Sequence, residues 1–124
     1  FSDQPNLRRL GMREDIERIY AACDIVSLCS AFGEGFPNVL VEGMSAGLAP
    51  IATDVGDCAL IIADIGKVVP PRDAEALAGA IQLIINSGHD KVKEVGRKAR
   101  ERIKQEYALE RTVETFDDVY RSAE

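Results

Sequence analysis

Two glutamates, Glu34 and Glu42, are the residues best placed to do chemistry in this chain. They stand at the two ends of the stretch EGFPNVLVE, around a Gly-Phe-Pro-Asn turn and a short apolar run. A strand-like run, DIVSLCS, precedes them, and a helix-like run, VEGMSAG, contains the second one. Because carboxylates accept hydrogen bonds from hydroxyl groups, the pair could hold two hydroxyl-bearing parts of one ligand.

The turn between the glutamates is predicted to bind an anion. The strand ends at Ser30, and a helix starts near Pro37 or Asn38, so the unpaired N–H groups of the helix start lie at the carboxyl edge of a sheet. Gly35 lets the backbone approach a ligand closely. Pro37 suits a first helical position, whose N–H is unpaired in any case, and Phe36 is expected to wedge the turn against the sheet.

A carboxylate beside a phosphate is repulsive unless it binds another part of the ligand. A ligand with a sugar, a diphosphate and a ribose in series satisfies both requirements. Glu42 could then accept hydrogen bonds from the two ribose hydroxyls, while Glu34 faces the sugar at the other end.

The segments around the turn alternate between helix and strand, which predicts an α/β fold with a Rossmann-like parallel sheet and flanking helices. Residues 1–124 are expected to form a single domain or a piece of one. Asp73 is the predicted N-cap of one helix. Helices are predicted over 13–23, from about 38 to 47, after Asp73, around 92–103 and over the terminal 108–124, and strands over 24–30, 50–55 and 67–69.

Composition limits the classes of function. The formal net charge of −6 argues against a nucleic-acid partner, because affinity for a polyphosphate backbone needs clustered Lys and Arg.

Cys23, Cys29 and Cys58 are irregularly spaced, and the first two are expected to be buried, which favours a reducing, cytoplasmic setting. The single histidine, His89, has no Cys or His at ligand spacing, so no metal site is predicted. No apolar run approaches the roughly 18 residues of a membrane span.

One stretch, residues 89–104, is locally basic. It could touch the acidic inner face of a membrane as a peripheral contact. A solvated helix face is the favoured interpretation, with Glu94 and Lys98 paired one helical turn apart.

The run SAFGEGFPNVLVEGMSAGLAPIATDVGD, with LGMREDIERIYAACDIVSLCS before it and GKVVPPRDAEALAGAI after it, resembles the carboxyl-terminal domain of the family 4 glycosyltransferases, retaining enzymes of the GT-B fold. Glu34 and Glu42 match the Glu, seven residues, Glu spacing of that family. The resemblance covers essentially the whole chain. It implies the carboxyl-terminal part of the second, nucleotide-sugar-binding domain of a hexosyltransferase.

The resemblance also implies roles for individual residues. Glu34, as the catalytic residue, would contact the donor sugar near its anomeric centre, and Glu42 would hold the ribose. No metal cofactor is expected, because positive side chains and a helix start neutralise the departing diphosphate. The donor diphosphate would lie along the turn, on Gly35 and the main-chain amides of Phe36, Asn38 and Val39. Pro37 is part of this turn but has no N–H to donate. The nucleobase would pack on Gly11, Met12 and Arg13.

The chain departs from the family pattern at a few positions. Gly43 replaces a frequent alanine inside the predicted helix, which would weaken that helix by up to about 1 kcal/mol. Asp57 stands where the family commonly has a second glycine, and Pro50 is displaced by one place. The half that supplies the acceptor site and the basic side chains over the diphosphate is absent from this sequence.

This piece alone is predicted to be inactive. A helix start contributes about 0.3 to 2 kcal/mol toward an anion, whereas millimolar affinity needs about 4 kcal/mol. The apolar surface that the absent elements would cover predicts that the fragment forms a homodimer. The acceptor, the sugar and the nucleobase are not specified by the sequence.

Two other functions fit parts of the pattern. Gly33 and Gly35 match the first two glycines of a dinucleotide fingerprint, and Asp54 follows about twenty residues later, as in an NAD-binding domain, but Asn38 stands where the third glycine belongs. A noncatalytic nucleotide-sensing or interaction domain is the other alternative. Arg13 could equally pair with Glu17 one helical turn on.

Overall fold

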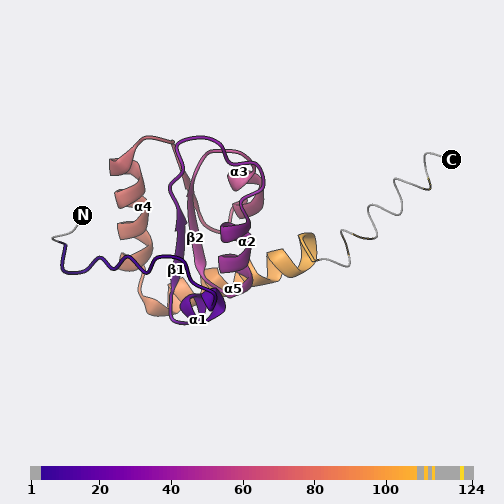
Figure 1. The fold of residues 1–124 in the computed structure, drawn as a ribbon, viewed down its shortest axis with the longest axis horizontal. Coiled ribbons are helices and arrows are strands. Elements are labelled where there is room, and N and C mark those ends of the chain that lie inside the picture. The colour runs from indigo at the N-terminus through magenta and orange to yellow at the C-terminus, as the bar shows by residue number, and fades with distance from the viewer. Residues whose placement is uncertain (1–3, 109–110, 112, 114–120, 122–124) are drawn as a thin grey trace.

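The computed structural model describes residues 4–108, 111, 113 and 121. Helices and strands alternate along it, as predicted, and the fold is α/β (Figure 1). The elements are α1 (Ile16–Ala21), β1 (Ile25–Leu28), α2 (Asn38–Ser45), β2 (Ala49–Thr53), α3 (Cys58–Ile62), β3 (Lys67–Val69), α4 (Ala74–Asn86) and α5 (His89–Glu106). Most of the predicted terminal helix, residues 108–124, lies outside the described residues.

The three strands form a parallel sheet in the order β1-β2-β3. Val26 lies opposite Pro50, and Ala52 lies opposite Val68. All five residues of the central strand β2 are buried, as expected for a parallel strand that is covered on both faces. The Rossmann-like parallel sheet with flanking helices is therefore confirmed.

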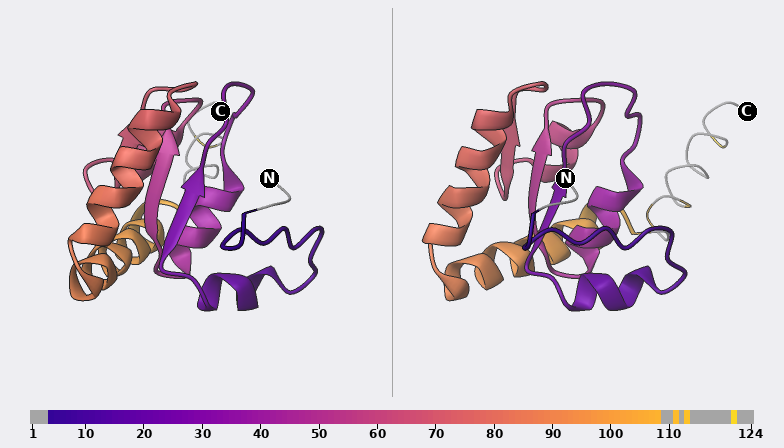
Figure 2. Two further views of the ribbon diagram at one scale, coloured as in Figure 1. Left: turned by 90° about the vertical axis from the view of Figure 1, so that its left-hand side faces the viewer. Right: turned by 60° about the vertical axis from the view of Figure 1, so that its left-hand side comes forward.

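Helices cover both faces of the sheet (Figures 1 and 2). On one face, Leu40 and Met44 of α2 pack in a core with Ile61 of α3. On the other face, Ile84 of α4 packs against Ile51 of β2. The long helix α5 crosses below the amino ends of the strands and reaches both cores, the first through Ala99 and Ile103 and the second through Val92.

Two glycines bring α5 close to the loop between α2 and β2. A Cβ at Gly96 would collide with the carbonyl oxygen of Gly47, so only glycine permits this crossing. Gly47 has a φ of 87° and follows the C-cap of α2, which confirms the predicted end of that helix.

The helix ends show one predicted and one unexpected cap. Asp73 Oδ1 accepts a 2.8 Å hydrogen bond from the amide of Ala76, which confirms Asp73 as the N-cap of α4. The short helix α3 was not predicted from the sequence. Its last carbonyls are bound by Arg102 of α5, whose Nε donates to Ile61 O and whose Nη2 donates to Leu60 O, both at 2.8 Å.

The surface of α5 is lined with ion pairs. Lys98 pairs with Glu94 at 2.9 Å, as predicted, and Lys93 reaches Asp24 at 2.8 Å. Within the described residues, no helix is both long and apolar enough to cross a membrane.

The cysteines only partly follow the prediction. Cys58 is buried and Cys23 is half-buried, but Cys29 is exposed, because it follows the last residue of β1 rather than lying inside the strand. All three are free thiols.

Candidate functional site

The chain that leaves β1 is held at the carboxyl edge of the sheet by a buried threonine. Thr53, the last residue of β2, is 3% exposed. Its Oγ1 donates a 2.6 Å hydrogen bond to the carbonyl oxygen of Ser30. The start of the predicted anion-binding turn is thereby tied to the neighbouring strand.

Glu34 lies half-buried inside this turn. Ser30 Oγ donates a 2.5 Å hydrogen bond to Glu34 Oε1, a short contact of the kind that a hydroxyl makes with a carboxylate. One carboxylate oxygen is thus held by the protein.

The loop after β2 supports the same turn from another side. The amide of Asp57 donates to the carbonyl oxygen of Gly35 at 3.2 Å. Gly56 has a φ of 51°, and a Cβ there would collide with the carbonyl oxygens of Glu34 and Gly35. A glycine at position 56 is required for this close approach, whereas nothing lies within 4 Å of the position that a Cβ on Gly35 would occupy.

Helix α2 begins at Asn38, and Pro37 is its N-cap rather than its first helical residue. Pro37 has an extended backbone, with φ −80° and ψ 90°, and its carbonyl oxygen accepts from the amides of Leu40 and Val41 at 3.0 and 3.3 Å. The amides of Asn38 and Val39 belong to the first turn and have no acceptor inside the helix. Helix α2 follows the carboxyl end of β1, so these amides lie at the edge of the sheet where an anion is expected.

Phe36 was expected to wedge the turn against the sheet, but it does not do so. Its side chain is 47% exposed, and its ring lies 5.7 Å from that of Tyr107 at an interplanar angle of 50°. Tyr107 is the C-cap of α5. Phe36 therefore ties the turn to the carboxyl end of α5.

Glu42 lies one turn into α2 and faces α1. Its Oε2 accepts a 3.2 Å hydrogen bond from the Tyr20 hydroxyl. Partial burial and the neighbouring Glu42 carboxylate both raise the pKa of Tyr20 above 10.0, so the hydroxyl keeps its proton. Between the two helices lies a cavity of about 210 Å³, lined by Ile16, Glu17, Tyr20, Glu42, Ser45 and Ala46.

The predicted nucleobase loop lies on the surface before α1. Gly11, Met12 and Arg13 are all exposed, Met12 completely so. Arg13 forms a two-pronged ion pair with Asp15, 2.8 Å from each oxygen, and not with Glu17 as considered from the sequence. The helix begins only at residue 16, so Arg13 and Glu17 are not one helical turn apart.

Three carboxylates lie close enough to the buried Cys58 thiol to affect it. The pKa of the Cys58 thiol is raised, mainly by burial and further by the negative charges of Glu34, Asp54 and Asp57. Of these residues, Asp57 also contacts the turn, through the hydrogen bond from its amide to Gly35 O. Among the described residues, no group of three His, Cys, Asp or Glu side chains is arranged to hold a metal ion.

Residues 2–87 match the family described as Glycosyl transferases group 1. This chain belongs to that family. The predicted resemblance to a GT-B glycosyltransferase is confirmed by this match and by the solved structures that share its fold.

Similar proteins carry several different names. Over 120 residues the chain is 31% identical to an exopolysaccharide phosphotransferase of Streptomyces coelicolor, covering 82% of this chain and 13% of that protein. Over 80 residues it is 36% identical to a phosphatidyl-myo-inositol mannosyltransferase of Mycolicibacterium smegmatis, covering 61% and 21%. The structure of Anabaena HepE in complex with UDP matches with a TM-score of 0.82 and 27% identity, over 91% of this chain and 31% of that one.

The chain thus spans 13% and 21% of the lengths of these two curated relatives.

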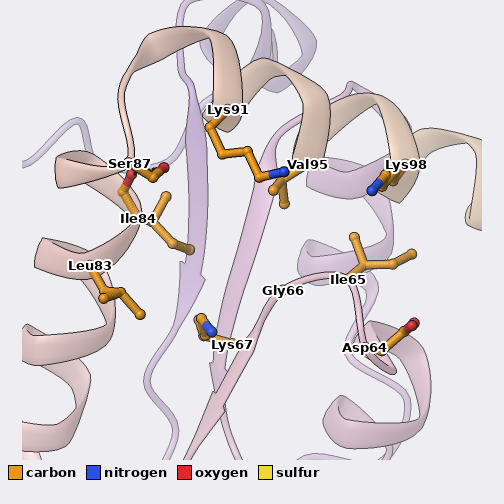
Figure 3. Close-up of a pocket in the computed structure, with 10 residues that line it drawn as sticks. All are labelled: Asp64, Ile65, Gly66, Lys67, Leu83, Ile84, Ser87, Lys91, Val95 and Lys98. Atoms are coloured by element: carbon orange, nitrogen blue, oxygen red, sulfur yellow. Dashed lines mark hydrogen bonds between the residues drawn. The ribbon is translucent and has the colours of Figure 1, made fainter.

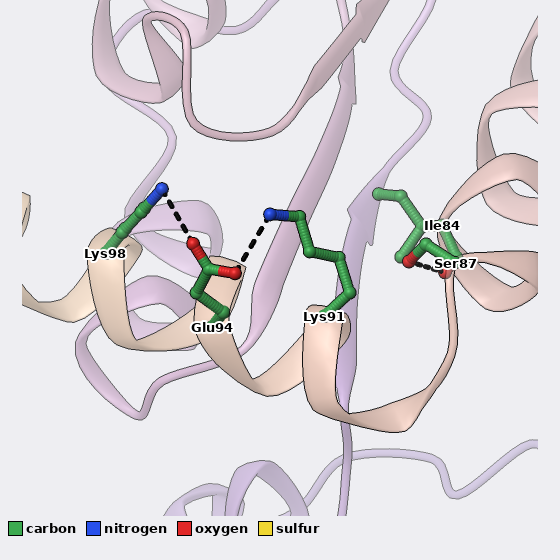
Figure 4. Close-up of polar contacts among 5 residues, drawn as sticks. All are labelled: Ile84, Ser87, Lys91, Glu94 and Lys98. Atoms are coloured by element: carbon green, nitrogen blue, oxygen red, sulfur yellow. Dashed lines mark hydrogen bonds and ion pairs between the residues drawn. The ribbon is translucent and has the colours of Figure 1, made fainter.

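A larger cavity lies at the amino end of β3, away from the residues predicted to bind the donor (Figure 3). Its volume is about 380 Å³, and three lysines, Lys67, Lys91 and Lys98, line it together with apolar side chains such as Val95. Glu94 binds Lys91 and Lys98 at 2.9 Å each and offsets one of the three lysine charges (Figure 4). The cavity contains none of the residues predicted for the donor.

Three residues that support the two glutamates were missed in the sequence. Thr53 and Ser30 support Glu34, and Tyr20 supports Glu42. Thr53 carries a weak signal, since a hydroxyl at the end of a fully apolar strand needs a buried partner. Tyr20 lies in the helix predicted over 13–23, and nothing in the sequence pairs it with Glu42.

Proposed function

We propose that this chain is the donor-binding part of a glycosyltransferase that moves a sugar, with retention of configuration, from a nucleoside-diphosphate sugar to an acceptor. The observation that carries the proposal is the arrangement of Glu34, Glu42 and the free amides of Asn38 and Val39 around one turn, in a chain of the Glycosyl transferases group 1 family. Anion binding at a helix start and hydroxyl binding by carboxylates explain why these groups occur together.

In the proposed reaction, the bond between the anomeric carbon and the diphosphate breaks as the acceptor attacks the same face of the sugar. The amides of Asn38 and Val39 stabilise the negative charge on the departing diphosphate. Glu34 holds hydroxyls of the sugar near the anomeric centre, and Glu42 holds the ribose. No metal ion is required in this proposal, because backbone dipoles and basic side chains of the complete protein would share that charge.

The nucleotide is proposed to be a nucleoside diphosphate, with the base packed on the exposed loop of Gly11, Met12 and Arg13. The UDP bound in the structure of Anabaena HepE supports this class of ligand. The name of the mycobacterial relative supports a hexose as the transferred group.

We infer that the reaction takes place in the cytoplasm, which the three free cysteines support. The isolated chain is proposed to be inactive, because it corresponds to only 13% and 21% of the lengths of the two relatives named above. Self-association of the isolated chain, and contact of the complete protein with an anionic membrane surface through the basic stretch 89–104, remain predictions. Analytical ultracentrifugation of the chain and co-sedimentation of the complete protein with anionic vesicles would test them.

Calorimetric titration of the complete protein with UDP, GDP, ADP and NAD tests the proposal. One nucleoside diphosphate should bind, and Glu42→Ala should weaken that binding about tenfold or more, as expected when a charged hydrogen-bond acceptor is lost. Glu101→Ala, on the exposed face of α5, is the matched control and should bind as the wild type does. Binding of NAD alone, lost in Asp54→Ala, would instead indicate a dinucleotide-binding domain.

A further inference from the structure

We propose that Ser30 and Thr53 are positioning residues that fix the orientation of the Glu34 carboxylate toward the donor sugar. This inference rests on the proposed function and extends it to two residues outside the sequence motif. Neither residue is proposed to touch the donor. They act through a chain of hydrogen bonds that starts in the buried end of β2 and finishes at Glu34.

The first link joins two neighbouring strands. The Thr53 hydroxyl has one proton, and two carbonyl oxygens lie near it, Ser30 O at 2.6 Å and Leu28 O at 3.5 Å. The shorter distance identifies Ser30 O as the acceptor, since a contact of 3.5 Å is at the limit for a hydroxyl. Because Thr53 is buried in the rigid central strand, it fixes the backbone of Ser30, which lies two residues beyond the end of β1.

The second link joins Ser30 to the carboxylate. Ser30 Oγ donates to Glu34 Oε1 at 2.5 Å. A serine hydroxyl donates only one hydrogen bond, so Glu34 Oε2 receives none from it. The two oxygens therefore have different tasks, one bound to the protein and the other available to a sugar hydroxyl.

The turn needs such a link because its own backbone is permissive. Glycines stand on both sides of Glu34, and nothing lies within 4 Å of the position that a Cβ would occupy on Gly33 or on Gly35. A free glutamate side chain populates many rotamers, and ordering them opposes binding. Because Ser30 holds Oε1 before the ligand binds, less side-chain entropy is lost on binding. Affinity therefore increases only for ligands that reach Glu34.

Because only ligands that carry a sugar reach Glu34, the inference is tested by comparing ligands with and without the sugar on the complete protein. The dissociation constants of UDP and UDP-glucose, GDP and GDP-mannose, and ADP and ADP-glucose are measured for each variant. Ser30→Ala and Thr53→Val should weaken binding of the sugar nucleotide by up to about tenfold, and Glu34→Ala by at least as much, while binding of the matching nucleoside diphosphate stays within twofold of wild type. Thr53→Ser keeps the hydroxyl and should restore the wild-type ratio. Ser27→Ala, which removes an exposed serine from β1, is the matched control.

Equal weakening of both ligands in Ser30→Ala would indicate general damage to the turn and would overturn the inference. A wild-type ratio of the two dissociation constants in Ser30→Ala would also overturn the inference. This measurement decides the question even if Thr53→Val does not fold. Failure of the wild-type protein to bind any of the six ligands would refute the proposed function instead. The positioning itself would then be decided by crystal structures of wild type and Ser30→Ala, in which an unmoved Glu34 carboxylate would contradict it.

Discussion

The Tyr20 hydroxyl donates a 3.2 Å hydrogen bond to Oε2 of Glu42, which joins the last turn of α1 to the second turn of α2. The two residues are 22 positions apart and are brought together by the strand β1 between them. A half-buried tyrosine thus sets the position of the carboxylate that is proposed to bind ribose. Glu34 has a similar partner in Ser30, so each glutamate of the motif is held by one hydroxyl.

Replacement of Tyr20 by phenylalanine should weaken nucleoside-diphosphate binding by the complete protein about threefold to tenfold. The reason is the loss of one hydrogen bond, worth about 0.5–1.5 kcal/mol, that orients Glu42. Calorimetric titration measures the effect. Tyr107→Phe removes a hydroxyl from the ring that packs on Phe36 and is the matched control. Equal affinities of wild type and Tyr20→Phe would show that Glu42 needs no partner.

Alanine at position 43 should destabilise the fold by about 1–3 kcal/mol, although alanine favours helices and is frequent at this position in the family. A Cβ on Gly43 would lie 2.7 Å from Cβ and Cγ2 of Val26, because α2 packs tightly on β1. Chemical denaturation followed by circular dichroism measures the free energy of unfolding.

Gly79→Ala is the comparison for Gly43→Ala in the same denaturation experiment, with an opposite expected effect on stability. It lies inside α4, and nothing lies within 4 Å of the position that a Cβ would occupy there, so Gly79→Ala should stabilise the protein by up to about 1 kcal/mol. Val26→Ala should relieve part of the cost of Gly43→Ala in the double variant. Stabilisation by Gly43→Ala alone would contradict the close packing of α2 and β1.

Removal of the Arg102 guanidinium should lower the free energy of unfolding by about 1–2 kcal/mol. Its two 2.8 Å hydrogen bonds satisfy the carbonyl oxygens of Leu60 and Ile61 at the end of α3, which otherwise need water. Arg102→Met keeps much of the side-chain volume, and Arg100→Met on the exposed face is the control. Thermal unfolding of the two variants should differ, and identical midpoints would argue against the cap.

Glu94 makes the stability of the protein dependent on acid pH. Hydrogen bonds from Lys91 and Lys98 lower the pKa of this carboxyl from 4.5 to about 2. A lowered acid pKa stabilises the folded state above pH 4.5, and this contribution declines as the pH falls from 4.5 to about 2. The melting temperature of wild type should therefore exceed that of Glu94→Gln at pH 7, by an amount that shrinks below pH 4.5. High salt should reduce the same difference, since the three side chains are exposed to solvent. A difference that is independent of pH would contradict this assignment.

Much of the fold could be predicted from the sequence because it depends on local patterns. Apolar runs predicted β1 and β2, the Asp73 cap predicted the start of α4, and Gly47 predicted the end of α2. The five-residue helix α3 was missed, since it is too short to show a helical period and is capped by Arg102 from a distant helix.

The candidate site shows the same division. Glu34, Glu42 and the helix start after Pro37 were identified by their types and spacing alone. The contacts that hold them were not, because Thr53 meets Ser30 only where two parallel strands end side by side.

The sequence by itself determined the α/β alternation, the two glutamates and the family resemblance, since these depend on the order of residues along the chain. Only the tertiary structure decided that Phe36 packs on Tyr107, that Gly43 must remain small against Val26, and that each glutamate is oriented by a hydroxyl. The physical reason is that the contacts of Phe36, Gly43 and Glu42 join elements distant in sequence. Ser30 and Glu34 are only four residues apart, but the loop that carries them is held by Thr53 of the neighbouring strand.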